Sequence, residues 1–200
     1  MWHVKNIMNF GLIYLNENKI YYSLKEDAEI KEIIIPKNLI NGNKIINYKQ
    51  LKKYIIKNFM KTNCLNRFFF IKVKIITPIE LSDIEKYNIR QIFNEVNIDI
   101  ISFIIENSIF NNYQNRIYIN CGTKNFYVHY KDNYKVQSLI FPNLLSLKTI
   151  IKSMRLNHVF QYVMIYGQVS YEQFIFKPNI YIYDKNPNFL FKKIYKMDNK

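Results

Sequence analysis

The residue types most often used in metal and thiol chemistry are sparse in this chain. Its three histidines, His3, His129 and His158, have no histidine four residues away and no cysteine pair nearby. A zinc site needs such a cluster, because the ion takes about four nitrogen or sulfur ligands. The two cysteines, Cys64 and Cys121, lie far apart without a CxxC pattern, which favours reduced buried thiols over a disulfide. We therefore expect no bound metal.

Basic and aromatic side chains make nucleic acid the alternative ligand to consider. The 200 residues include 29 basic and 15 acidic ones, a formal net charge of +14, and residues 126–135 interleave aromatic rings with lysine (FYVHYKDNYK). Such rings could stack on bases, but alternating tyrosines on a strand are more often half buried in a sheet. Only four basic residues are arginine, and the abundance of Ile, Asn and Lys indicates an AT-rich genome. The many lysines are then partly a codon effect, which weakens the argument from net charge. RNA binding or ribosome association is therefore only our second hypothesis.

The clearest structural pattern is a strand-helix-strand unit in the middle of the chain. The β-branched and aromatic run Phe68–Ile76 predicts a strand. Ser82 followed by Glu85 is a capping box that predicts the start of a helix. Ile98–Ile105 is almost continuously apolar, which is typical of a strand buried on both faces of a sheet. The apolar stripe expected along the helix consists of Ile84, Ile89, Ile92, Phe93 and Val96.

Similar elements precede and follow this unit, so that each half of the chain reads β-β-β-α-β-α-β. The first half adds strands at Ile7–Leu15, Lys19–Leu24 and Ile30–Ile35 and a helix capped by Asn47. The second half has strands at Arg116–Cys121, Asn125–Lys131, Lys135–Phe141, Tyr162–Gly167 and Asn179–Tyr183, helical segments at 144–154 and 171–174, and a last helix from Asn188. The repeat predicts two α/β domains, residues 1–106 and 107–200, each with a mixed five-stranded sheet, and a final helix that can pack back on the first.

This duplicated order resembles the plan of the actin and DnaK-type ATPase superfamily, and the local sequence is similar to the bacterial actin MreB. Three segments carry the resemblance: ITPIELSDIEKYNIRQIFNEVNIDIISFIIENSI, NGNKIINYKQLKKYIIKNF and IYIYDKNPNFLFKKIYK. It implies two small ribonuclease-H-like domains side by side. MreB-like proteins carry extra subdomains where this chain has only Pro36–Asn47 and Asn157–Gln161, so we expect a truncated form.

The loops that grip nucleotide in that superfamily are altered in this sequence. Family members have Asp-x-Gly-(Thr/Ser) and Asp-x-Gly-Gly-Gly-Thr loops, whose glycines let backbone N–H groups approach phosphate and whose aspartates hold Mg²⁺. The resemblance matches these loops to residues 9–12 (NFGL) and 120–124 (NCGTK), where asparagine replaces both aspartates. Glu106 falls at the family's acidic position near the attacking water. The degenerate nucleotide-binding residues that the resemblance implies are Asn9, Gly11, Asn120, Gly122, Thr123 and Gly167.

These departures predict a degenerate actin-like protein that does not hydrolyse ATP. Water activation needs a metal–phosphate assembly, so we expect Glu106 to cap the cleft rather than act as a catalytic acid, and we expect no cofactor, with ATP and Mg²⁺ as the alternative. The protein would act as a protein-binding or cytoskeletal scaffold for an actin-like filament or membrane-associated cell-shape machinery. A third hypothesis is a residual nucleotide switch. No signal peptide or long apolar span is found, which predicts a cytoplasmic protein, peripheral at most to the inner membrane face.

Overall fold

Two five-stranded sheets of the same topology form the molecule. The computed structural model describes residues 10–24, 29–41, 44–62, 71–110, 115–122, 124–132, 135–142, 147–157, 160–167, 180–182 and 187–198. The first sheet contains β1 (Gly11–Asn16), β2 (Lys19–Ser23), β3 (Lys31–Ile34), β6 (Ile71–Thr77) and β7 (Ile98–Ile105). The second contains β8 (Arg116–Cys121), β9 (Asn125–Asp132), β10 (Lys135–Pro142), β11 (Tyr162–Gly167) and β12 (Ile180–Ile182).

The strand orders confirm the duplicated α/β fold predicted from the sequence. They are β3-β2-β1-β6-β7 in the first sheet and β10-β9-β8-β11-β12 in the second. In each sheet the first three strands of the chain pair in antiparallel fashion. The fourth strand, β6 or β11, adds in parallel beside β1 or β8, and the fifth, β7 or β12, adds in parallel beside the fourth. The helical segment expected around residues 171–174 lies outside the described residues.

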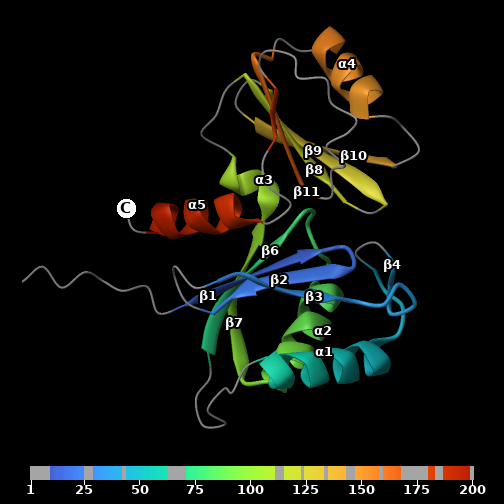
Figure 1. Cartoon of the computed structure of the whole chain (residues 1–200), viewed down its shortest axis with the longest axis vertical. Helices are drawn as coiled ribbons and strands as arrows, with labels where there is room; N and C mark the ends of the chain where they lie inside the picture. The colour runs from blue at the N-terminus through green and yellow to red at the C-terminus, as the bar shows by residue number, and fades with distance from the viewer. Residues whose placement is uncertain are drawn as a thin grey trace, which may run out of the picture.

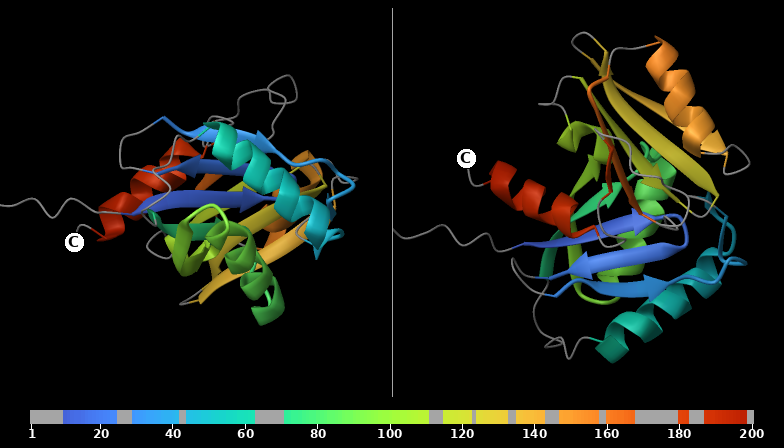
Figure 2. Two further views of the ribbon diagram at one scale, coloured as in Figure 1. Left: turned by 90° about the horizontal axis from the view of Figure 1, so that it is seen from below. Right: turned by 45° about the horizontal axis from the view of Figure 1, so that its top comes forward.

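The helices lie in separate layers around the sheets (Figure 1). They are α1 (Tyr48–Thr62), α2 (Asp83–Asn94), α3 (Glu106–Ile109), α4 (Leu147–Asn157) and α5 (Asn188–Asp198). Helices α1 and α2 cover the outer face of the first sheet, and α4 covers the outer face of the second. Helices α3 and α5 lie between the sheets, and the right-hand view of Figure 2 shows α5 in the same place.

The two connections that the sequence predicts to be short are short in the structure. Between β3 and α1 the chain forms only a small hairpin of β4 (Ile40–Asn41) and β5 (Lys44–Ile45). In the second half, α4 ends at Asn157 and β11 begins at Tyr162. Within the described ranges, no helix is long and apolar enough to cross a lipid bilayer.

Local sequence signals position the helices of the first domain. The Ser82 Oγ accepts the backbone N–H of Glu85, and the Glu85 carboxylate accepts the backbone N–H of Ser82 at 2.8 Å, so the capping box is confirmed. The Asn47 Oδ1 accepts the backbone N–H of Gln50 at 3.1 Å, which confirms the predicted cap of α1.

Two predictions of burial are wrong in this domain. Ile84 was expected on the apolar stripe of α2 but is 74% exposed. It lies five residues before the buried Ile89, which places it about 140° away around the helix. Strand β7 was expected to be buried on both faces, but it is an edge strand, and Ile101 is 43% exposed. A continuous apolar run therefore did not distinguish a central strand from an edge strand.

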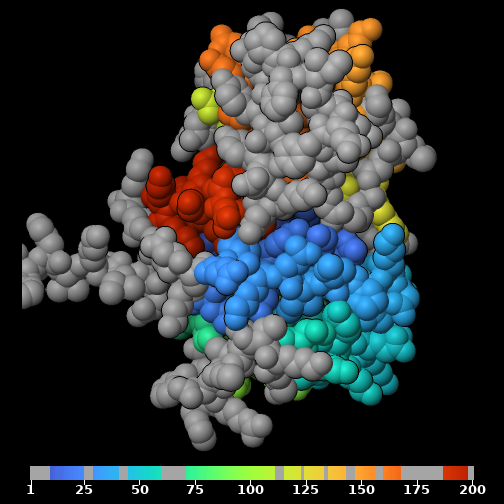
Figure 3. Space-filling view, in the orientation of Figure 1, coloured from blue at the N-terminus to red at the C-terminus, as the bar shows by residue number. Residues whose placement is uncertain are grey.

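A hydrophobic core shared by the two domains joins them. It contains Leu12, Tyr14, Tyr21 and Ile76 from the first sheet, Tyr118, Met164 and Tyr166 from the second, and Leu190, Phe191, Ile194 and Tyr195 from α5. Helix α5 therefore packs on the inner faces of both sheets, and the space-filling view shows it between the two domains (Figure 3). Burying this apolar surface holds the carboxyl ends of the central strands close together.

Candidate functional site

The candidate site lies where three strands end at the boundary between the domains. Tyr14 comes from β1, Glu106 follows directly after β7, and Asn120 is the residue before the end of β8. In open α/β sheets, ligands bind outside the carboxyl ends of the strands. The fold thus places these three side chains where a ligand would be expected.

These three side chains bind to one another. The Tyr14 hydroxyl donates to Glu106 Oε1 at 3.0 Å. The Asn120 amide nitrogen donates to Glu106 Oε2 at 3.1 Å and lies 2.5 Å from the Tyr14 hydroxyl oxygen. Glu106 and Asn120 are both fully buried. Both oxygens of the Glu106 carboxylate therefore accept hydrogen bonds from other side chains of the protein.

His129 completes the environment of Glu106 from the second sheet. Its Nε2 lies 3.2 Å from Glu106 Oε2, and its Nδ1 lies 3.0 Å from Ser138 Oγ. The Ser138 oxygen also accepts a hydrogen bond from the Asn107 amide at 3.0 Å. In either direction of the contact with Ser138, the Nε2–H of His129 can donate to Glu106. Glu106 and His129 are both fully buried, so the Glu106 carboxylate is shielded from water.

Two tyrosines keep their protons beside this carboxylate. Burial, together with the negative charge of Glu106, raises the pKa of Tyr14 well above its ordinary value. The same two causes raise the pKa of Tyr166. A protonated Tyr14 is the form that donates to Glu106, so the electrostatics and the hydrogen-bond geometry agree.

A pair of asparagines marks equivalent points in the two sheets. The sequence Ile-Tyr-Leu-Asn at residues 13–16 ends β1, and Ile-Tyr-Ile-Asn at residues 117–120 lies at the end of β8. The amide nitrogen of Asn16 donates to Asn120 Oδ1 at 3.3 Å. Asn16 was not among the expected site residues, although this repeated four-residue pattern was visible in the sequence and could have identified it.

The turn after Asn16 delivers a carboxylate to the other domain. Glu17 Oε2 accepts the backbone N–H of Lys124 at 2.9 Å, and Oε1 accepts the backbone N–H of Asn125 at 3.1 Å. Oε1 also accepts from the Asn125 amide at 3.3 Å and from the Tyr127 hydroxyl at 3.2 Å. Glu17 is only 5% exposed. Sequence reasoning missed this residue, because its partners are more than 100 positions away.

The structure brings three of the six expected nucleotide-binding residues together: Asn120, Gly122 and Gly167. Asn120 and Glu106 are in contact, and a Cβ atom on Gly122 would lie 2.7 Å from Glu17 Oε1. Gly167 has a φ of +92°, and a Cβ there would lie 2.6 Å from the carbonyl oxygen of Cys121. Gly122 and Gly167 therefore serve close packing at this site.

The first expected nucleotide loop, residues 9–12, does not lie at this site. Gly11 begins β1, at the opposite end of the strand from the turn that carries Glu17, and its Cα packs against the backbone of Ser23 and Leu24. Asn9 and Thr123 lie outside the described residues. By its place in the sheet, the counterpart of the β8–β9 loop is the turn from Asn16 to Lys19.

The side chains in this arrangement do not fit a magnesium–phosphate group. A divalent ion of this kind favours carboxylate oxygens, but Asn16 and Asn120 are neutral, and the Glu106 oxygens are bound to Tyr14, Asn120 and His129. The Glu17 carboxylate lies against Gly122, where a phosphate would need the bare backbone. No cluster of three potential metal-binding side chains exists among the residues described in the structure.

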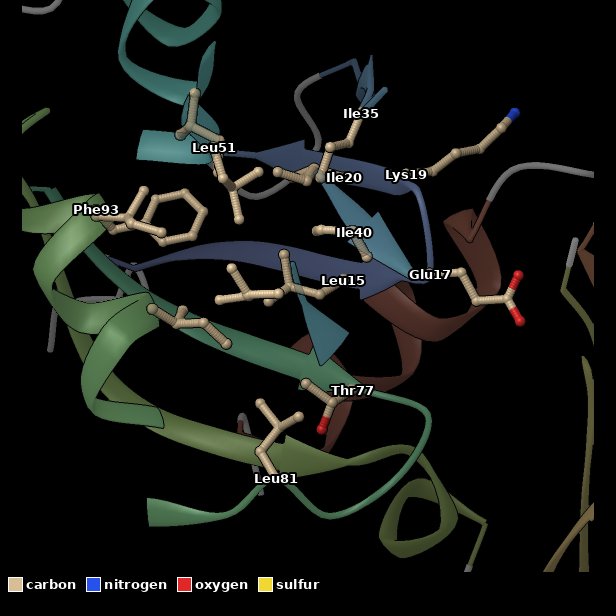
Figure 4. A pocket seen from close by; sticks show the side chains of 14 residues that line it. Leu15, Glu17, Lys19, Ile20, Ile35, Ile40, Leu51, Thr77, Leu81 and Phe93 are labelled. Carbon is tan, nitrogen blue, oxygen red and sulfur yellow. The ribbon is translucent and has the colours of Figure 1, made fainter. Parts of the chain in front are cut away.

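A separate apolar cavity of about 50 Å³ lies inside the first domain (Figure 4). It is lined by side chains that include Leu15, Ile20, Ile40, Leu51 and Phe93, and the charged ends of Glu17 and Lys19 point away from it. Thr77 also lines it, and its hydroxyl donates to the carbonyl of Ile79 at 2.8 Å. The cavity therefore offers no reactive group.

The aromatic and basic run at residues 126–135 is mostly part of the core. Tyr127 is buried and donates to Glu17, and Tyr130 is buried in the core beneath α4. Tyr134 lies outside the described residues. The described tyrosines of this strand are therefore occupied by internal packing, as the sheet interpretation predicts.

Comparisons with known proteins place the fold. No protein-family model and no curated protein matches the sequence. Among solved structures, the ethanolamine utilization protein EutJ from Carboxydothermus hydrogenoformans superposes with a TM-score of 0.63 at 8% identity, over 92% of this chain and 87% of that one. A Bacteroides thetaiotaomicron protein with an actin-like ATPase fold and unknown function gives 0.58 at 9% identity, over 97% and 99%. The AlfA filament bound to AMPPNP gives 0.54 at 12% identity, over 88% and 89%.

The chain therefore has the actin-like ATPase fold. This confirms the recognition of the superfamily at the level of fold, since identities this low carry no information about activity. The finer likeness to MreB remains a prediction from the sequence.

Proposed function

We propose that this chain is a non-hydrolysing actin-like scaffold that works by binding another protein. The observation that carries the proposal is the state of Glu106, the residue at the family's acidic position. A general base must reach a water molecule within hydrogen-bond distance, whereas Glu106 is fully buried and its oxygens are bound by Tyr14, Asn120 and His129.

The neutral residues around Glu106 support the same proposal. Phosphoryl transfer depends on metal ions that neutralise the developing charge on the phosphate oxygens. The paired asparagines, Asn16 and Asn120, contribute no charge for holding such an ion and instead bind each other. We infer that the space used for nucleotide in the superfamily serves here to join the domains.

The kind of partner is the finer part of the proposal. One protein of similar fold, AlfA, is solved as a filament, which supports association with protein. We propose an actin-like filament or membrane-associated cell-shape machinery as the partner, with the protein in the cytoplasm or at the inner membrane face. Pull-down on assembled actin-like filaments, with monomeric subunits as the control, tests this part.

Nucleotide titration tests the central claim. We expect the melting temperature of the purified protein to stay constant when ATP or ADP is added with Mg²⁺, because only a ligand that binds the native state raises it. We also expect no phosphate release above that of the Glu106→Gln variant. A magnesium-dependent rise in melting temperature, with turnover that Glu106→Gln abolishes, would show instead that the protein is an ATPase.

A further inference from the structure

The loop that joins β8 and β9 presents several donors to a single carboxylate. The backbone N–H groups of Lys124 and Asn125, the Asn125 amide and the Tyr127 hydroxyl all point at the two oxygens of Glu17, at 2.9 to 3.3 Å. Successive backbone N–H groups in a turn form a concave site for anions. Two backbone donors and two side-chain donors of the second domain therefore converge on one carboxylate.

The space for the anion depends on Gly122. A Cβ atom at this position would lie 2.7 Å from Glu17 Oε1 and 2.8 Å from its Cδ. Any other residue would push the carboxylate out of the loop unless the backbone moved. The absence of a side chain at Gly122 therefore leaves room for a carboxylate, and the carboxylate in that space is that of Glu17 from the other domain.

The turn that supplies Glu17 holds an unfavourable backbone conformation. Glu17 has a φ of +51°, in the left-handed region that residues with a Cβ atom seldom adopt. Such a conformation persists when the surrounding contacts determine it. The four hydrogen bonds to the second domain are contacts of this kind, because they fix the side chain from a different part of the chain.

We propose that the β8–β9 loop is an anion-binding cradle and that the Glu17 carboxylate is its resident ligand. The cradle accepts a small oxyanion of the carboxylate or phosphate class. By filling it, Glu17 closes the two domains on each other without an external ligand. This inference is independent of whether Glu106 can activate water, because it concerns a different carboxylate and a different loop.

Chemical rescue tests the cradle. In Glu17→Gly, the turn remains and the carboxylate is lost, so a free anion can enter. We expect this variant to melt about 10 °C below the wild type, since charge-assisted hydrogen bonds are lost. Sodium formate or inorganic phosphate, titrated against sodium chloride at constant ionic strength, should recover much of that loss in a saturable way.

Two further variants make the result specific. Glu80→Ala removes an exposed glutamate of the same domain and should show no anion response beyond that of the wild type. Glu17→Gln keeps the cradle filled with a neutral amide. It should melt at a lower temperature than the wild type and should not respond to formate. This variant still tests the proposal if Glu17→Gly does not fold. Rescue by formate alone or by phosphate as well supports the cradle and reports its size. Wild-type melting of Glu17→Gln, or an equal anion response in all variants, would overturn it.

Discussion

The two turns that follow the central strands of the sheets hold equivalent positions but have opposite roles. The β1–β2 turn, from Asn16 to Lys19, supplies a carboxylate through Glu17, and the β8–β9 loop receives it through the N–H groups of Lys124 and Asn125. The side chain of one turn is thus bound by the backbone of the other. The comparison shows that turns at equivalent places in a duplicated fold can take opposite parts in a single contact between the domains.

The same asymmetry extends to the paired asparagines. Asn120 binds both Glu106 and Tyr14. The Asn16 side chain donates to Asn120, and its Oδ1 has no hydrogen-bond partner among the described residues. More of the buried hydrogen bonds around Glu106 therefore depend on Asn120 than on Asn16. Charge substitutions can measure this difference directly.

The largest expected effect is that of Asn120→Asp. The change removes the donor to Glu106 and places a second buried carboxylate beside it, so we expect the free energy of unfolding to fall by about 3 kcal/mol. Asn16→Asp, which is equally isosteric, should cost about 1 kcal/mol because fewer contacts are lost. Urea unfolding of both variants provides the measurement, and each is the control for the other.

Equal losses in the two variants would contradict the asymmetry. The double variant sharpens the question, because two carboxylates facing each other could hold a divalent ion. We expect Mg²⁺ to leave its melting temperature unchanged, since Glu17 and Tyr14 still fill the space. A rise that depends on Mg²⁺ would show that two substitutions restore a metal site.

Gly122→Ala should have the next largest effect and should be coupled to Glu17. The added methyl group meets the Glu17 carboxylate and the carbonyl oxygen of Asn125, and we expect a loss of about 2 kcal/mol. In the Glu17→Gly background part of this loss should disappear, because one of the two clashes is gone. A double-mutant cycle measured by urea unfolding gives the coupling energy. Strict additivity of the two changes would mean that Gly122 serves the turn alone.

The smallest expected effect is on the pH dependence of stability, and it concerns Lys193 in α5, the helix that packs between the domains. Lys193 lies over the rings of Phe110 and Tyr118. Burial, and secondarily the charge of Arg116, lowers the pKa of Lys193 from 10.5 to about 8. The unfolded chain then binds the proton more tightly than the folded protein does, so stability should rise as the pH increases from about 8 towards 10.5.

The Lys193→Met variant isolates this contribution. Its stability should rise less than that of the wild type between pH 7.5 and 9.5, a range below the titration of the buried tyrosines. Exposed Lys192, changed to methionine, is the matched control and should keep the wild-type slope. Parallel stability curves for the wild type and Lys193→Met would show that burial does not perturb this lysine.

The two phosphate-loop predictions show where sequence reasoning was limited. The second loop was found because Asn120 and Gly122 keep the spacing of the family pattern, and the structure places both at the site. The first was matched to residues 9–12 because Asn9 and Gly11 keep the spacing of the family's Asp-x-Gly pattern. The turn at that place in the sheet contains no glycine, and Glu17 takes the positive φ instead.

The sequence by itself determined the features that depend on neighbours in the chain. The capping box of Ser82 and Glu85, the cap at Asn47 and the repeated strand and helix order are all encoded within a few residues, so their hydrogen bonds could be anticipated. Only the tertiary structure decided which side chains meet between the domains. Glu17 and Lys124 are 107 positions apart, and their contact depends on how the shared core packs the two sheets together, a geometry that no local pattern records.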